Sequence, residues 1–201
     1  MTGQKYQKIR QIFRANKGYA RTGELLAKGV HPRDIRAMVD EGLISKVKTG
    51  LYKLSDVPAV SHQSFVDIAQ AVPEGVICLL SALSYHRLTT FNPSVVSVAI
   101  YRKAWRPKIA YPPVEFYYFS EKQFHAGVET ITVKDQKIRI YSPEKTICDC
   151  FRYRNKLGVD TAKEALTEYL KRKNRNIEKL LEFAAVCRVK PVLQTWLNAM
   201  I

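Results

Sequence analysis

The first 57 residues carry the pattern that most constrains the fold: short amphipathic helices separated by strong stop signals, followed by a hairpin. Apolar residues recur at helical spacing over residues 6–15, which predicts the first helix. A second short helix is expected after Thr22, which is a good N-cap residue, and should end at Gly29. Little chain is left for loops, so this segment is predicted to fold as a compact module.

A third helix is predicted after the turn formed by Val30, His31 and Pro32, because proline is favoured at the first helical position. This helix should run to about Glu41 and stop at Gly42. Its inward stripe is expected to be Ile35, Met38 and Val39, and its outward residues are Arg33, Arg36, Ala37 and Asp40.

The hairpin is predicted from Thr49-Gly50, a dipeptide that suits a two-residue turn. That turn pairs Lys48 with Leu51, Val47 with Tyr52, Lys46 with Lys53, and Ser45 with Leu54. Alternation would then put Lys46, Lys48 and Lys53 on one face of the hairpin. Like charges opposite each other are unfavourable unless phosphate neutralises them. A three-residue loop with Gly50 in a bulge would change this pairing.

Together these elements predict a winged helix-turn-helix that binds DNA. Arg33 and Arg36 are the candidate base readers, because arginine can bind guanine through two hydrogen bonds. His31 fits a turn or cap better than a base contact, and the lysines would hold phosphates. The alternative is a basic surface that binds nothing. The full set of predicted DNA-binding residues is Arg21, Thr22, His31, Arg33, Arg36, Lys46, Lys48, Thr49 and Lys53.

The charge of the chain favours a polyanionic partner. Its 201 residues carry a formal net charge of +15, which points to nucleic acid or an anionic membrane surface. No apolar run approaches the roughly 18 residues of a membrane span, and the N-terminus lacks a signal-peptide core. We therefore expect a cytoplasmic protein with no membrane partner.

No catalytic, metal or cofactor site is predicted. The four cysteines form no C-x-x-C pair, and the four histidines are scattered, so buried reduced thiols are expected. There is no P-loop, G-x-S-x-G or H-E-x-x-H motif. The sequence thus favours a protein that is not an enzyme and needs no cofactor.

After a short linker at residues 56–60, the rest of the chain predicts an α+β domain. Strands are expected at 95–101, 114–119, 128–133 and 137–141, in an antiparallel arrangement, and a helical bundle at about 142–201. The predicted organisation is a winged helix-turn-helix over residues 1–57, followed by a mixed α/β domain with antiparallel strands and a helical tail over residues 58–201.

Two further features stand out in this second part. Asp149 lies among apolar neighbours in a predicted helix, and Arg152 or Arg154 could pair with it. A connection between strands mixes cations with an aromatic residue, and could grip nucleic acid, contact a partner or be a solvated loop. Its residues are Arg102, Lys103, Trp105, Arg106 and Lys108.

The chain resembles the AbiEi antitoxins of bacterial type IV toxin-antitoxin systems in three segments. The first contains GVHPRDI at residues 29–35, EGL at 41–43 and TGLY at 49–52. The second is SALSYHRLT at 81–89. The third and most specific is YSPEKTICD at 141–149, continuing into FRYRNKLG at 151–158.

The resemblance implies an N-terminal winged helix-turn-helix that represses its own operon at promoter repeats in double-stranded DNA. It also implies a C-terminal domain that counters a nucleotidyltransferase-like toxin, without a stable complex being required. The DNA-contact role carries over to Arg33, Arg36 and the hairpin lysines. The alternatives are a nucleic-acid-processing enzyme targeted by a winged helix, and a protein-interaction module.

Overall fold

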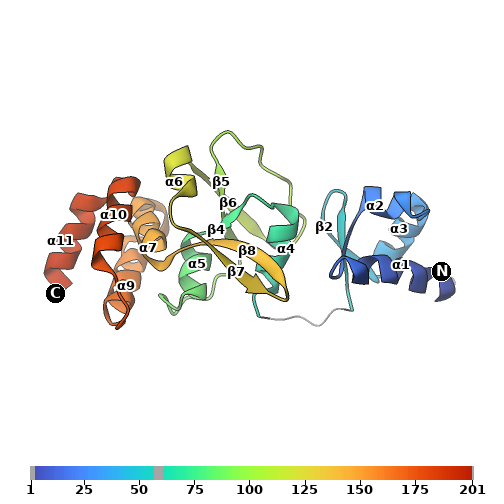
Figure 1. Cartoon of the computed structure of the whole chain (residues 1–201), viewed down its shortest axis with the longest axis horizontal. Coiled ribbons are helices and arrows are strands. Elements are labelled where there is room, and N and C mark those ends of the chain that lie inside the picture. Colours follow the sequence, from blue (N-terminus) through green and yellow to red (C-terminus); the bar gives the residue numbers. More distant parts are fainter. Residues whose placement is uncertain (1–2, 57–60, 201) are drawn as a thin grey trace. The chain divides into compact units, whose positions relative to one another are not determined.

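The computed structural model describes residues 3–56 and 61–200, which form two compact units. The first unit extends to Ala71 and also contains residues 107–112, and the second holds the rest of the chain. Helices and sheet occur in both units, so the predicted α+β class is confirmed (Figure 1). The first unit continues past the predicted boundary at residue 57. Residues 57–60 of the predicted linker lie outside the described residues.

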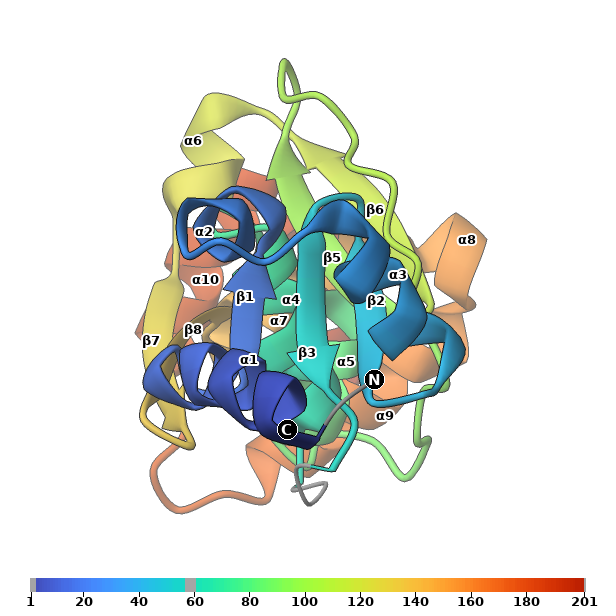
Figure 2. The same cartoon turned by 90° about the vertical axis from the view of Figure 1, so that its right-hand side faces the viewer.

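The first unit is built on a three-stranded antiparallel sheet in the order β1-β3-β2. Figure 2 shows its three N-terminal helices grouped around these strands. Strand β1 was not predicted, because three residues are too few to show alternation. The elements are α1 (Gly3–Ala15), β1 (Tyr19–Arg21), α2 (Thr22–Ala27), α3 (Pro32–Asp40), β2 (Ile44–Lys48), β3 (Leu51–Leu54) and α4 (Gln63–Ala71).

One face of this sheet closes the helix-turn-helix core. Phe13 of α1, Leu25 of α2 and Met38 of α3 are fully buried in this core. Ala20, Ile44 and Leu54 contribute to it from the strands. Each helix therefore buries apolar residues in this core, and the predicted inward stripe of α3 is confirmed, with Ile35 and Met38 buried and Val39 partly buried. Their burial fixes which side of each helix is left for solvent.

The second unit contains a five-stranded mixed sheet in the order β6-β5-β4-β8-β7. Its elements are β4 (Val76–Ile77), α5 (Leu79–Tyr85), β5 (Val96–Tyr101), β6 (Val114–Phe119), α6 (Glu121–His125), β7 (Val128–Val133), β8 (Gln136–Tyr141), α7 (Pro143–Arg152), α8 (Arg154–Leu157), α9 (Val159–Leu170), α10 (Ile177–Cys187) and α11 (Lys190–Met200).

The prediction of antiparallel strands is only partly right for this sheet. β4–β5 and β7–β8 are antiparallel, but β5–β6 and β4–β8 are parallel. A parallel neighbour requires the chain to return to the same end of the sheet. Residues 102–113 provide that return between β5 and β6. The sequence analysis took this stretch as a connection between antiparallel strands, which is why the direction of β6 was missed.

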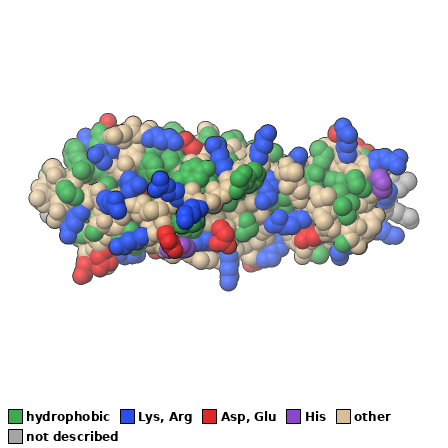
Figure 3. Space-filling view, turned by 90° about the horizontal axis from the view of Figure 1, so that it is seen from above, with side chains coloured by type: hydrophobic (Ala, Val, Ile, Leu, Met, Phe, Trp, Pro, Cys, Tyr) green, Lys and Arg blue, Asp and Glu red, His purple; other side chains and the backbone are tan. Residues whose placement is uncertain are grey.

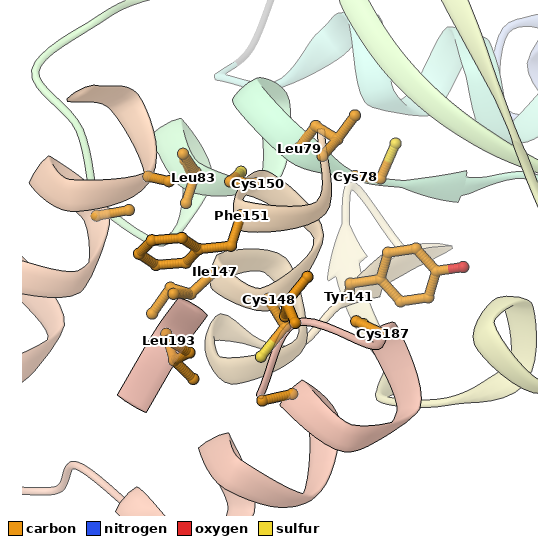
Figure 4. Close-up of a cluster of buried hydrophobic side chains, with 14 of the residues drawn as sticks. Cys78, Leu79, Leu83, Tyr141, Ile147, Cys148, Cys150, Phe151, Cys187 and Leu193 are labelled. Carbon is orange, nitrogen blue, oxygen red and sulfur yellow. The ribbon is translucent and has the colours of Figure 1, made fainter. Parts of the chain in front are cut away.

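Helix α7 is the centre of the second core, with α9, α10 and α11 packed around it as a helical tail. It begins as predicted, with Ser142 as N-cap and Pro143 in the first turn. Figure 4 shows Ile147, Cys148 and Phe151 pointing into the surrounding cluster. All four cysteines are free and buried, which agrees with the prediction of reduced structural thiols.

A buried ion pair lies inside α7. Lys145 Nζ donates to both carboxylate oxygens of Asp149, at 2.7 and 2.6 Å, and neither side chain is exposed. Burial raises the pKa of the Asp149 carboxyl, and the Lys145 ammonium opposes that shift. The predicted pairing with Arg152 or Arg154 is wrong. The signal for the true partner was the four-residue spacing, which places two helical side chains together.

Candidate nucleic-acid interface

Helix α3 presents its cationic side to solvent from a firmly anchored N-terminus. His31 is the N-cap: its Nδ1 accepts a hydrogen bond from the Arg33 backbone N–H at 3.2 Å. Pro32 fills the first turn, as predicted. His31 is thus a cap residue in this structure, the role that the sequence favoured. The cap therefore fixes the position from which the Arg33 side chain projects out of the helix.

Arg33 and Arg36 are both exposed, whereas Ile35 and Met38 are buried on the opposite side. Residues three apart on a helix lie on the same face, so the two guanidinium groups project together. The neighbouring acid is neutralised locally: Lys5 forms a 2.8 Å ion pair with Asp34. That hydrogen bond from Lys5 holds the pKa of the Asp34 carboxyl below its usual range. The N-terminal half of α3 therefore has a cationic outer face.

The start of α2 meets the tip of the hairpin. The Thr22 backbone N–H donates to the Gly50 carbonyl at 3.0 Å. Thr22 is the first residue of α2 and not its cap, because Arg21 precedes the helix in an extended conformation. The Arg21 N–H donates to Glu24 Oε2 at 2.8 Å, and the Arg21 side chain is exposed. Arg21, Thr22 and Thr49 are thereby brought to one edge of the unit.

The hairpin register differs from the prediction because β2 contains a bulge. Lys48 pairs with Leu51 as expected, but Lys46 pairs with Tyr52 and Ser45 with Lys53. Val47 is the extra residue in the bulge and is fully buried. Residues paired across strands share a face, so Lys46 and Lys53 lie on opposite faces of the sheet. The prediction of a single lysine face is therefore wrong.

Two of the three hairpin lysines serve internal contacts. Lys53 Nζ forms a 2.6 Å ion pair with the buried Asp67 of α4, which also accepts from the Tyr19 hydroxyl at 2.5 Å. Lys48 Nζ donates to the Ala71 carbonyl at 2.5 Å, and burial lowers the pKa of its ammonium. Helix α4 thus covers the sheet face that carries these lysines. Lys46 alone among the three is exposed, whereas Lys48 and Lys53 are partly buried.

Residues 107–112 add a partner to the edge of β2. Ile109 forms an isolated bridge with Lys48. The Val47 carbonyl accepts from the Ala110 N–H at 2.8 Å and from the Tyr111 N–H at 3.3 Å. Lys53 Nζ lies 5.1 Å from the centroid of the Tyr111 ring. Sequence reasoning missed this contact, because nothing in the local pattern shows that a bulged carbonyl needs a distant donor.

Arg21, Arg33, Arg36, Lys46 and Thr49 are the exposed residues that we refer to together as the α3 face. The first unit carries 13 Lys and Arg against 6 Asp and Glu, and therefore has a net charge of +7. The space-filling view in Figure 3 shows how many more Lys and Arg side chains than acidic ones reach the surface seen there. Such an excess attracts polyanions at long range.

The second predicted cluster is divided between the units. Arg102, Lys103, Trp105 and Arg106 belong to the second unit and Lys108 to the first. All five are exposed. The five residues therefore do not form one surface within a single compact unit.

Within residues 3–56 and 61–200, no group of three or more His, Cys, Asp or Glu side chains is arranged to hold a metal ion. In the same part of the chain, no helix combines the length and apolar character required to cross a bilayer.

One comparison with known proteins gives a match. Residues 7–54 match the family described as "Transcriptional regulator, AbiEi antitoxin", which covers the stretch from α1 to β3. No curated protein matches the chain. The resemblance found in the sequence is thereby confirmed for the N-terminal segment.

Proposed function

We propose that this chain, whose residues 7–54 match the AbiEi antitoxin regulators, is a transcriptional autorepressor that binds repeats in the promoter of its own gene. The observation that carries the proposal is the pair of exposed arginines on the N-terminal half of α3. The opposite side of that helix is fixed in the core. A helix held in this way can enter a major groove without losing its own packing.

Each residue of the α3 face has a separate role in this proposal. Arg33 and Arg36 read base edges, because a guanidinium can donate two hydrogen bonds to guanine. Arg21 and Lys46 contact phosphates on either side of the groove, and Thr49 approaches the backbone from the hairpin tip. Lys48 and Lys53 have no direct role, since their ammonium groups bind Ala71 and Asp67.

Fluorescence anisotropy with duplexes from the upstream region, and with a scrambled duplex of equal length, tests this proposal. Arg33→Ala and Arg36→Ala should each cost about 1–3 kcal/mol of discrimination between the two duplexes. Lys46→Ala should weaken binding to both duplexes alike and reduce the salt slope by about 1. Wild-type discrimination in the double arginine variant would overturn the proposal.

The second part of the proposal is an antitoxin role in a type IV system. The chain would act in the cytoplasm against a nucleotidyltransferase-like toxin, with no stable complex and no catalysis of its own. The family match supports an antitoxin regulator, and this finer role extends it. Co-expression with a nucleotidyltransferase-like product of the adjacent gene tests the proposal: growth should recover, also with Arg33 and Arg36 replaced by alanine. Cleavage of DNA or RNA by the purified chain would contradict it.

A further inference from the structure

The loop after β5 exposes a tryptophan that the DNA-binding role leaves unused. Trp105 is 82% exposed, more than the other large hydrophobic residues exposed in the described chain. Indole is a large apolar group that proteins usually bury. Its neighbours at the surface are Arg102, Lys103 and Arg106, and all three are exposed. We call residues 102–106 the Trp105 loop.

The ends of the Trp105 loop are held in place. The Arg102 N–H donates to the Phe119 carbonyl at 2.9 Å, and the Ala104 N–H to the Tyr101 carbonyl at 2.8 Å. At the other end, the Arg106 guanidinium lies 5.6 Å from the centroid of the Phe116 ring. In Figure 1 the chain projects beyond the end of β5 before it returns toward β6. The indole is therefore presented on an anchored turn that follows the C-terminal end of β5.

The cations of the loop are available to an external anion. In residues 61–200, which include the loop and all its sheet neighbours, Arg102, Lys103 and Arg106 form no ion pair. The hydrogen bond from Lys156, at 2.5 Å, lowers the pKa of the Glu115 carboxyl, and the charge of Arg106 makes a smaller contribution. The whole second unit carries 20 Lys and Arg against 12 Asp and Glu, a net charge of +8.

We infer that the Trp105 loop is a binding site for single-stranded nucleic acid, in which the indole stacks on an unpaired base and Arg102, Lys103 and Arg106 hold the flanking phosphates. Alternation of an aromatic plane with cations is the arrangement of a single-strand stacking platform. A base inside a duplex is already stacked on both faces, so only an unpaired base offers a free face.

An acidic polypeptide fits this loop less well. Aromatic anchors of protein interfaces insert into desolvated pockets surrounded by other contacts. The residues next to Trp105 in the loop are instead mainly charged. A single-stranded nucleic acid fits both parts of the loop, because every nucleotide has a planar base for the indole and an adjacent phosphate for the cations. The site lies in the second unit, so it does not depend on the α3 face.

The two tryptophans of the chain allow a direct test. Full-length Trp196→Phe protein keeps Trp105 as its only tryptophan, and a single-stranded oligothymidylate of about 12 nucleotides is a suitable probe. Stacking should quench the Trp105 emission. In anisotropy titrations Trp105→Ala should weaken binding about tenfold, whereas the matched Trp196→Phe variant should bind as the wild type does.

The contacts between the loop cations and phosphates can be tested through the salt dependence of binding. Arg102→Gln and Lys103→Gln should each reduce the slope of log affinity against log salt by about 0.7, the value for one phosphate contact on a single strand. Arg33→Ala/Arg36→Ala should retain quenching by oligothymidylate, which separates this site from the proposed duplex site.

Three results would overturn the inference. One is unchanged oligothymidylate affinity in Trp105→Ala. Another is equal or stronger quenching by a polyglutamate peptide, which would make the loop a surface for acidic protein. The last is binding of a blunt-ended, fully paired duplex to the Arg33→Ala/Arg36→Ala variant with the same quenching and affinity as the single strand.

Discussion

Lys53 of β3 and Asp67 of α4 form an ion pair of 2.6 Å, in which the Asp67 side chain is 1% exposed and the Lys53 side chain 20% exposed. The Tyr19 hydroxyl donates to the same carboxylate. A charge buried this deeply is tolerated only when it is paired and hydrogen-bonded. The contact therefore assigns a hairpin lysine to folding and joins α4 to the three-stranded sheet.

Replacing Lys53 should destabilise the first unit. Lys53→Met leaves Asp67 with the Tyr19 hydroxyl but without its counter-charge, and we expect a loss of about 2–4 kcal/mol. Urea unfolding followed by circular dichroism would measure it. Lys46→Met is the matched control, because Lys46 is exposed, and it should stay within about 0.5 kcal/mol of wild type. Equal stability of Lys53→Met and Lys46→Met would contradict the structural role of Lys53 and make Lys53 a candidate phosphate contact again.

Helix α3 could be predicted from the sequence because the signals that define it are local. Each of these signals spans only a few residues: the proline at position 32, the stop at Gly42 and the apolar stripe with a period of 3.6 residues. The cap role favoured for His31 follows from the same short-range logic. The exposure of Arg33 and Arg36 then follows from the burial of Ile35 and Met38.

The hairpin register could not be predicted, because it depends on contacts far along the chain. The bulge at Val47 lets its carbonyl accept from Ala110, more than sixty residues away in sequence. Asp67 likewise lies beyond the predicted boundary of the module. A prediction limited to residues 1–57 therefore left the lysines facing solvent when one sheet face is in fact covered.

The buried pair in α7 predicts strong non-additivity. Lys145→Met or Asp149→Leu alone should each cost about 3–5 kcal/mol, because either change leaves an uncompensated charge in the core. The double variant should recover much of that loss, since a buried ion pair can be replaced by apolar groups of similar volume. A double-mutant cycle from urea unfolding measures the coupling. Simple addition of the two losses would contradict the assigned pairing.

Glu164 of α9 should make the second unit sensitive to acid. The Thr90 backbone N–H donates to its carboxylate at 2.9 Å, and the hydroxyls of Thr89 and Thr90 donate at 2.9 and 3.0 Å. These bonds, the backbone one foremost, lower the pKa of Glu164. A carboxyl with a lowered folded pKa adds stability above its unfolded pKa, and that stability disappears as the pH falls through the folded value.

The melting temperature of wild type should therefore fall more steeply than that of Glu164→Gln between about pH 5 and pH 3, the range below an ordinary glutamate pKa. Glu168→Gln on the same helix is the control, because Glu168 accepts only from the exposed Lys171 among the contacts described for it. Parallel pH curves for wild type and Glu164→Gln would contradict the predicted linkage.

The bridge from residues 107–112 to β2 can be tested by removing a single donor. Ala110→Pro deletes the N–H that binds the Val47 carbonyl at 2.8 Å. Because the Val47 carbonyl still accepts from the Tyr111 N–H, urea unfolding should show the loss of one hydrogen bond, about 0.5–1.5 kcal/mol. Ala110→Ser keeps the N–H and should behave as wild type. Amide exchange gives a local readout: protection should fall at Lys48 and Leu51, whereas α3 should keep its protection. Unchanged exchange in β2 would mean that the bulged carbonyl does not depend on this segment.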